Sequence, residues 1–405
     1  GKTVSSALRR MIVANVACLT GATMFIFLNA YLIAEGMQRW EIGCCEAGFW
    51  CASVFLQPFL GPQLDKRGRV MFLRLGVALL ITTAVGLALA PPILIFMMPL
   101  RALQGAGFAA YLTSAWTWLS DHCPPDKVQS YFGIFGLSSL VGSVMGPGLA
   151  QLSRGNPALD VRAFAVSAVI LGVSLIVLFT LRDRPRTEIA TKASTASASL
   201  WDLAKRRSLR GPIFDSLTFG LAVGSIFAFA AAFMVQRGVE HVALIFITLT
   251  LVAGVGRGFC GHLSQRFGSV ALVTPCLLFL AVGNFGLGSL QWMFDPPLLL
   301  LVGVGGIAGL GYGLVYPVLR SIVYERLHAS ERGRGMSLVS GTIDVGHTFG
   351  AVVAGIIAQN YGEGKMFMIT GATVVITSLL AKIWDRSARK TDRKSTRLNS
   401  SHLVI

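Results

Sequence analysis

The chain has 405 residues, of which 54% are apolar and only 13% are charged. Soluble domains carry roughly 25% charged residues, so this composition excludes an ordinary soluble fold and indicates that lipid is the main solvent. The net charge of +16 does not indicate a nucleic-acid partner, because Lys and Arg lie in short segments between apolar runs.

The apolar runs predict an all-α membrane protein with twelve spans, since about 20 apolar residues cross about 30 Å of hydrocarbon. The first six spans are expected at 11–34, 42–64, 70–90, 93–119, 129–152 and 161–181. The last six are expected at 211–235, 242–261, 269–290, 297–323, 335–358 and 366–383. The predicted domains are a six-helix bundle over 1–181, a linker over 182–210, a second bundle over 211–384 and a tail over 385–405.

The end of the chain differs in character from the rest. Residues 391–405 read TDRKSTRLNSSHLVI, which resembles translated read-through of a sequencing adaptor. We expect the sequence from about residue 392 to be such an artefact, and it carries no weight in the fold prediction. The alternative is a disordered basic tail.

Lys and Arg residues are distributed unevenly between the two sides of the predicted membrane. The side of both termini holds 29 of the 35, including Arg257 and Arg320, and the other side holds five. Arg101, inside the fourth predicted span, completes the total. Because cytoplasmic segments collect Lys and Arg, we expect both termini and the linker on the cytoplasmic side of a bacterial inner membrane.

The two predicted halves resemble each other at fixed offsets. Residues 61–68 (GPQLDKRG) match 261–268 (GHLSQRFG), and residues 104–107 (QGAG) match 308–311 (AGLG). A pair of glycines repeats in the same way, Gly142 and Gly146 matching Gly346 and Gly350. Duplication of a six-span unit predicts two pseudo-symmetric bundles with a transport site between them.

The most specific motif lies between the second and third predicted spans. Its glycines permit a tight turn, and its charged residues can pair across that turn. Its members are Gly61, Asp65, Lys66, Gly68 and Arg69. This pattern resembles motif A of the major facilitator superfamily, although Gln63 and Val70 depart from it.

The resemblance to that superfamily covers residues 11–383 and implies twelve helices in two bundles. It also implies that the motif gates the outward-facing state, with Asp121 as the candidate partner of Arg69. The fourth span, where Arg101 precedes Gln104, Gly105 and Gly107, resembles motif B, whose arginine is implied to act in proton coupling or substrate contact. Outward snorkelling of Arg101 is the alternative.

The fifth predicted span resembles motif C, which is typical of exporters and antiporters of the superfamily. Its members are Gly133, Gly142, Gly146 and Pro147, while Ala150 and Gln151 replace the closing glycines. Small residues permit close helix contact, so these positions are expected to pack helices together.

Carboxylates inside spans are candidate functional groups. Glu46 has a similar predicted depth to Arg101, and such a pair can hold and release a proton. Asp344 and His347 lie three residues apart on one face of the eleventh span and form a second candidate relay. The alternatives are Glu46 among outer headgroups and a purely structural Asp344–His347 pair.

The superfamily lines its cavity with the first, fourth, seventh and tenth spans, which gives the candidate substrate contacts. They are Asn29, Tyr31, Tyr111, Trp116, Tyr312 and Tyr316. Aromatic rings there can stack an apolar or cationic solute, and ordinary packing is the alternative for each.

These features favour proton-coupled efflux of a small organic molecule by alternating access, as a monomer in the lipid bilayer. Coupled uptake on the same fold is the first alternative, and a receptor or membrane enzyme is the second. No H-E-x-x-H, G-x-S-x-G or Walker motif is present, so no enzyme is expected. The seven Cys include no C-x-x-C pair, and neither a metal nor a cofactor is expected.

Overall fold

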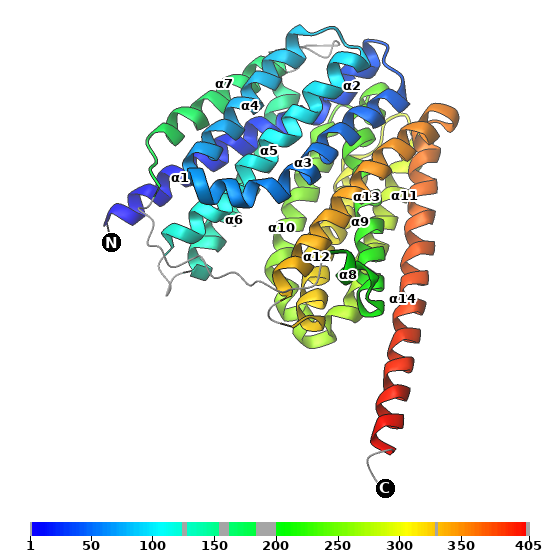
Figure 1. Ribbon diagram of the computed structural model, residues 1–405. Helices are drawn as coiled ribbons and strands as arrows, with labels where there is room; N and C mark the ends of the chain where they lie inside the picture. The colour runs from blue at the N-terminus through cyan, green and yellow to red at the C-terminus, as the bar shows by residue number, and fades with distance from the viewer. Residues whose placement is uncertain (1, 124–127, 154–161, 184–199, 329–330, 402–405) are drawn as a thin grey trace.

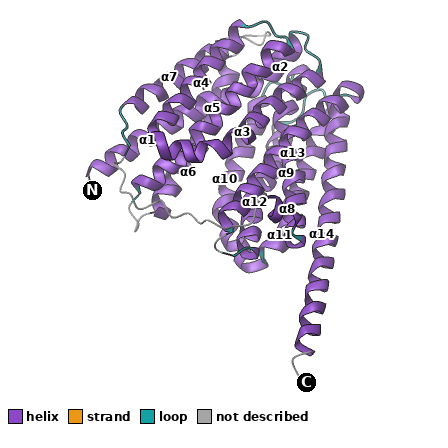
Figure 2. Ribbon diagram, viewed as in Figure 1, coloured by secondary structure: helices purple, strands orange, loops and turns teal. Residues whose placement is uncertain are grey.

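The computed structural model describes residues 2–123, 128–153, 162–183, 200–328 and 331–401, and within them the chain forms helices and short connections but no strand (Figure 1, Figure 2). The helices of the first half are α1 (Lys2–Thr23), η1 (Met24–Phe27), α2 (Leu28–Ala34), α3 (Arg39–Arg67), α4 (Arg69–Leu89), α5 (Leu94–His122), α6 (Val128–Ser153) and α7 (Arg162–Phe179). Those of the second half are α8 (Leu200–Lys205), α9 (Arg207–Gln236), α10 (Val242–Phe267), α11 (Ser269–Ser289), η3 (Leu290–Trp292), α12 (Leu298–Arg326), α13 (Arg332–Tyr361) and α14 (Glu363–Ser401).

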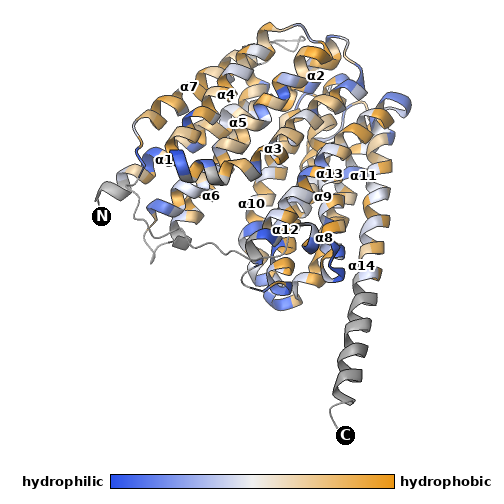
Figure 3. Cartoon of the chain, viewed as in Figure 1, coloured by the Kyte–Doolittle hydropathy of each residue, from blue (hydrophilic) through white to orange (hydrophobic). Residues whose placement is uncertain are grey.

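Twelve long helical segments account for the twelve predicted spans, with α1, η1 and α2 together forming the first. Among the described residues, nine segments are long and apolar enough to cross a membrane by themselves. Of the others, α3 and α5 are equally long, and polar residues such as Glu46 and Arg101 lower their mean hydropathy. In Figure 3 hydrophobic residues cover most of the coloured part of the long helices, and hydrophilic ones gather near α8 and the nearby end of α12.

The structure corrects the predicted boundaries in three places. The helix α3 continues to Arg67, so most of the motif expected as a loop is helical and Gly68 alone connects α3 to α4. Two helices fall within the predicted linker, because α8 lies there and α9 begins at Arg207; residues 184–199 lie outside the described part. The last helix, α14, continues to Ser401 and projects beyond the bundle (Figure 1).

The two halves meet at one end of the molecule, which we call the closed end, near α2. There Gly43 lies so close to α13 that an added Cβ would sit 2.5 Å from the Ala351 oxygen. At this end α2 also packs on α9, and the Gln151 side chain of α6 accepts from the Ala243 amide of α10 at 2.6 Å. These contacts hold the first and second halves together at the closed end.

Toward the opposite end, which we call the linker end because α8 lies there, α6 and α10 separate. Leu140 of α6 packs against Gly254 of α10, where an added Cβ would lie 2.7 Å from it. About one turn further on, Gly136 of α6 and Gly258 of α10 have nothing within 4 Å of an added Cβ. The helices diverge in the same direction in Figure 1. The structure is therefore closed at one end and parted at the other.

Glycines that pack helices together occur at equivalent places in the two halves. Gly107 lets α5 approach α4 at Gly76, and Gly311 lets α12 approach α11 at Leu280. Connections repeat too, because Gly68 and Gly268 each join two helices with a positive φ, 91° and 81°. An L-residue other than glycine rarely adopts that conformation, so the duplicated sequence produces a duplicated backbone.

Candidate functional site

A buried ion pair joins α3 to α5 within the first half. The Glu46 Oε1 atom lies 2.5 Å from an Arg101 guanidinium nitrogen, and the two residues are only 6% and 7% exposed. The Arg101 guanidinium also donates to Gln104 and lies over the Phe49 ring, 4.7 Å from its centroid. A charge inside a membrane is costly unless it faces the protein interior and is paired, and Arg101 meets both conditions. The geometry does not show outward snorkelling of Arg101.

Glycine brings these two helices within reach of each other. A Cβ added to Gly105, one turn along α5 from Arg101, would collide with the Phe49 carbonyl of α3. Close approach of the two backbones is what lets the short Glu46 side chain reach the guanidinium. The small residue of the motif B-like segment therefore positions the ion pair.

Asn29 connects this ion pair to the second half. Its Nδ2 donates to Glu46 Oε1 at 2.9 Å and to the backbone oxygen of Ala228 in α9 at 2.8 Å. Asn29 is 3% exposed, and its Oδ1 has no partner among the described residues. One amide group thus bonds simultaneously to an ionisable carboxylate of the first half and to the backbone of the second.

The second predicted pair lies where α13 crosses α3. His347 Nδ1 is 3.9 Å from Asp344 Oδ1, longer than a hydrogen bond, and neither ring nitrogen of His347 has a hydrogen-bond partner among the described residues. Across the boundary between halves, Trp50 stacks on His347 and Gln57 donates to Asp344 Oδ2 at 3.3 Å. Asp344 and His347 therefore belong to a contact between the two halves.

The motif A-like segment forms a corner at the linker end. Arg69 Nε lies 2.9 Å from Asp121 Oδ2, which is the predicted pairing of α4 with α5. Gly68 turns the chain with φ +91°, and Lys66 is exposed. Gly61 and Asp65 lie on the helical backbone of α3, but their side-chain positions fall outside the described structure.

Asp183 is a part of this corner that the sequence does not indicate. Its Oδ1 accepts from the backbone amides of Arg69 and Val70, both at 3.1 Å, and so caps the first turn of α4. A Cβ on Gly68 would collide with the same carboxylate. The corner thus needs glycine for its conformation and for the approach of Asp183.

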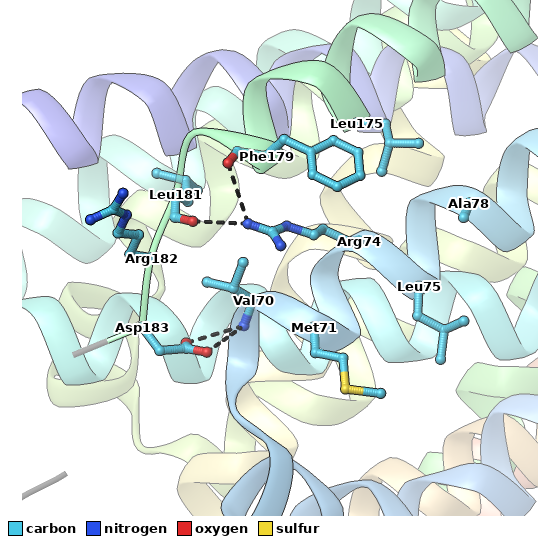
Figure 4. Close-up of a pocket in the computed structure, with 10 residues that line it drawn as sticks. All are labelled: Val70, Met71, Arg74, Leu75, Ala78, Leu175, Phe179, Leu181, Arg182 and Asp183. Carbon is cyan, nitrogen blue, oxygen red and sulfur yellow. Dashed lines mark hydrogen bonds between the residues drawn. The ribbon is translucent and has the colours of Figure 1, made fainter. Parts of the chain in front are cut away.

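A pocket of about 510 Å³ opens beside this cap, between α4 and α7 (Figure 4). Arg74 extends across it and donates to the carbonyl oxygens of Phe179, the last residue of α7, and of Leu181, two residues beyond the helix. The bond to Phe179 satisfies a helix-end carbonyl that has no partner within the helix. The walls of the pocket therefore include the capped start of α4 and the capped end of α7.

The glycines of the motif C-like segment behave differently from one another. Gly142 and Gly146 of α6 lie against the α1 backbone, so an added Cβ would sit 2.8 Å from the Val16 oxygen and 2.7 Å from the Thr20 oxygen. Pro147 is buried in α6. Gly133 is exposed and an added Cβ would meet nothing, so the packing role expected for it is not seen.

The remaining substrate candidates are scattered. Tyr111 is fully buried and donates to Asn15 at 3.1 Å, so it offers no surface to a solute. Tyr31 packs its ring edge on Phe164 of α7. Trp116 is 37% exposed beside the aromatic residues of α6. These first-half positions do not converge on one site.

Tyr312 and Tyr316 do converge, and two arginines accompany them. The Arg257 guanidinium of α10 lies 5.3 Å from the Tyr312 ring centroid, and the Arg320 guanidinium lies 4.3 Å from that of Tyr316. Arg320 also donates to the Tyr316 hydroxyl and, at 3.0 Å, to Ser340 Oγ of α13. Both arginines were counted with the charges on the side of the termini, although the predicted spans 242–261 and 297–323 contain them, and the structure places them within α10 and α12.

Polar residues at the closed end form a further contact that the sequence did not indicate. Arg39 of α3 lies 2.5 Å from Glu363 of α14 and donates to Gln236 of α9 at 3.0 Å. The side chains of Gln359 and Gln38 are joined at 2.7 Å. Exposed polar residues near span ends carry no pattern that distinguishes such partners from ordinary interfacial positions.

At the linker end, Arg206 forms a two-bond pair with Glu331 of the second half, at 2.6 and 2.7 Å. The hydrogen bonds from Arg206 hold the pKa of Glu331 below its usual value and raise that of Arg206. This pair lies outside the membrane-spanning segments.

Comparison with known proteins places these features in context. The family model described as the Major Facilitator Superfamily matches residues 11–306 and 241–404. The multidrug resistance protein MdtG of Escherichia coli O17:K52:H18 (strain UMN026 / ExPEC) is 23% identical over 398 residues, covering 94% of this chain and 95% of that protein.

Solved structures of similar fold include a point mutant of the nucleoside transporter NupG, with a TM-score of 0.82 at 14% identity, covering 94% of this chain and 99% of that one. They also include a bacterial homolog of the human lysosomal transporter Spinster in an inward-facing and occupied conformation. Its TM-score is 0.77 at 15% identity, with 96% of this chain and 97% of that chain covered. At such identities the likeness concerns the fold.

Proposed function

We propose that this chain, which belongs to the Major Facilitator Superfamily, exports a small organic molecule in exchange for protons. Membership makes it a membrane transporter rather than an enzyme. The bundles over 1–181 and 211–384 act as the two rocking units, and the predicted linker 182–210, which contains α8 and the first residues of α9, joins them. A single chain contains both, so a monomer suffices.

The proposed orientation puts the closed end toward the outside and the linker end in the cytoplasm of a bacterial inner membrane. The excess of Lys and Arg on the side of both termini supports this orientation. The contacts at Gly43 and the separation beyond Gly254 then correspond to an inward-facing state. Solute would enter from the cytoplasm in this state.

The observation that carries the coupling proposal is the double hydrogen bond of Asn29. An ionised Glu46 attracts both Arg101 and the Asn29 amide, and the same amide holds Ala228 of the second half. When Glu46 takes up a proton, its attraction for both donors falls. Proton binding at Glu46 is thereby linked to the contact that closes the outer end.

An exchange cycle follows from this linkage. In the outward-facing state Asn29 parts from Ala228, the solute that entered from the cytoplasm leaves to the outside, and Glu46 takes a proton from outside. The molecule returns to the inward-facing state, the proton leaves to the cytoplasm, and the ion pair with Arg101 forms again. Asp344 and His347, at the other contact between halves, are proposed as a second proton-binding pair.

The export direction is supported by two features. The relatives with 23% identity carry the name multidrug resistance protein. The α6 segment with Gly142, Gly146 and Pro147 resembles the motif typical of exporters.

Everted membrane vesicles test the proposal, because their inside corresponds to the cell exterior. We expect a panel of fluorescent dyes and drugs to include compounds that accumulate in vesicles when the interior is acidified, and an uncoupler to abolish the accumulation. The Arg101→Ala variant should lose the accumulation, whereas Arg266→Ala, at an exposed position of α10, should keep it. Gradient-driven loss of solute from acidified vesicles, instead of accumulation, would identify coupled uptake.

A further inference from the structure

The tyrosines that could receive a solute already carry guanidinium groups. Arg257 covers Tyr312 and Arg320 covers Tyr316, at 5.3 and 4.3 Å. An aromatic face attracts one cation, but a second cation at the same ring meets like-charge repulsion. These rings are therefore poorly placed to stack a cationic solute.

Helix geometry shows which way Arg257 faces. The apolar stripe of α10 consists of Leu251, Val255 and Phe259, which are 44%, 60% and 61% exposed and suit contact with lipid. Arg257 is also exposed, but it follows Val255 by two residues, or about 200° around the helix. It therefore emerges on the face away from the stripe, beside α12.

Its position along α10 is equally specific. The contact of α10 with α6 reaches Gly254, and Gly258 already has nothing within 4 Å of an added Cβ. Arg257 lies between these two positions, where the halves begin to part toward the linker end. A solute that approaches from the linker end would meet this side chain.

Arg320 continues the same surface on α12. Tyr312, Tyr316 and Arg320 are each four residues apart and so lie on one helix face. Tyr312 in turn packs against Phe219 and Phe227 of α9. The result is an aromatic wall with two guanidinium groups along it.

Among the residues that the structure describes, neither arginine has a carboxylate partner. Among the described residues the polar partners of Arg320 are the Tyr316 hydroxyl and Ser340, and its buried Nε has no hydrogen-bond partner. The Arg257 guanidinium lies over the Tyr312 ring, and it forms no ion pair with any residue that the structure describes. Unneutralised charge at membrane depth is costly and marks a place where an anion would be stabilised.

We propose that Arg257 and Arg320, with Tyr312 and Tyr316, form a binding subsite for organic anions that carry an aromatic or apolar body. The guanidinium groups would bind a carboxylate or similar anionic group by charge-assisted hydrogen bonds, and the rings would pack on the body. This inference rests on the proposed function as a transporter of small organic molecules, and it specifies the class of solute.

Equilibrium binding to the purified full-length chain in lipid nanodiscs tests the subsite without any proton gradient. Three probes share one ring system and differ in charge: 2-naphthoate, 2-naphthamide and 2-naphthyltrimethylammonium. We expect the anion to bind about tenfold more tightly than the amide, a difference of about 1.4 kcal/mol, and the cation to bind most weakly.

The variants Arg257→Gln and Arg320→Gln should each remove most of the preference for the anion, and Arg257→Lys should keep part of it. Arg266→Gln, on the exposed end of the same helix, is the matched control and should leave the preference unchanged. Thermal unfolding of every variant establishes that it is folded.

Equal binding of the three probes, a preference for the cation, or no binding of naphthoate to the folded chain would overturn the subsite. Anion preference that depends on Arg257 and Arg320, in a protein that shows no proton-driven transport, would sustain the subsite and contradict proton-coupled export. The two proposals therefore fail separately.

Discussion

Trp50 of α3 and His347 of α13 stack across the boundary between the two halves, with ring centroids 4.2 Å apart and planes 12° from parallel. His347 is 5% exposed, and the backbone around it packs on Gly220 and Gly224 of α9. The imidazole thus contacts the indole of the other half, while the His347 backbone packs on a helix of its own half. Separation of the halves at this place must break the stack.

Replacement of Trp50 by alanine should favour the state in which the closed end has opened. An aromatic pair contributes about 0.5–1.5 kcal/mol beyond its buried area, so the ratio of closed to open molecules should fall about 2- to 12-fold. Spin labels at Glu35 and Glu240, exposed positions of the two halves at the closed end, report this ratio as a distance distribution.

Trp292→Ala is the control for the Trp50 variant. Trp292 lies in η3 and is 70% exposed, so its removal should leave the distance distribution of the labels unchanged. An unchanged distribution in Trp50→Ala as well would show that the stack does not stabilise the closed end.

Gly68 and Gly268 both have a positive φ, so substitutions at these two positions separate the conformational need for glycine from the need for space around its Cα. Gly68→Ala and Gly268→Ala both force alanine into an unfavourable conformation, which costs about 1–3 kcal/mol. Only at Gly68 does the new Cβ also collide with Asp183, while nothing lies within 4 Å of it at Gly268. We expect a larger fall in the melting temperature for Gly68→Ala.

Addition of Asp183→Ala should narrow that difference, because the collision partner is then absent. If Gly68→Ala and Gly268→Ala lower the melting temperature equally, both with Asp183 present and with Asp183→Ala, the cap does not constrain the corner.

The Arg206–Glu331 pair should respond to acid only. Its partner lowers the pKa of Glu331 below the ordinary 4.5, so the pair stabilises the fold above that value and its effect is lost as pH falls through the lowered pKa. The difference in melting temperature between the parent and Arg206→Gln should be constant from pH 6 to 8 and shrink below about pH 4.5.

A difference that changes between pH 6 and 8 would show that another titrating group acts on this pair. Constancy over that range would show that this pair makes no contribution to any pH dependence of transport near neutrality.

Much of the fold could be predicted from the sequence because lipid imposes a simple length requirement on each helix. The ion pair of Glu46 and Arg101 was also accessible, since rise per residue gave both a similar depth. The positive-φ corner at Gly68 belonged to a recognisable motif. Helix ends were less predictable, as α3 shows, because polar residues near a span end are compatible with both helix and loop.

Other contacts of the site could not be predicted from the sequence. The partner of Asn29 is the backbone oxygen of Ala228, and backbone acceptors have no residue-type signature. The cap by Asp183 depends on how α7 ends relative to α4. Arg257 and Arg320 lie toward the cytoplasmic ends of their predicted spans and were counted with the cytoplasmic charges. Only the direction in which each helix faces distinguishes them from lipid-anchoring residues.

We propose that protonation of Glu46 links the proton gradient to movement of the two halves. The Glu46→Gln variant in proteoliposomes tests it directly, because glutamine resembles the permanently protonated side chain. Solute exchange without a gradient should persist in this variant, while uphill accumulation driven by a proton gradient should be lost. The control is Glu240→Gln, an exposed position at the closed end, which should retain both activities. Uphill accumulation in Glu46→Gln at the level of the parent would show that Glu46 does not couple the proton gradient to transport.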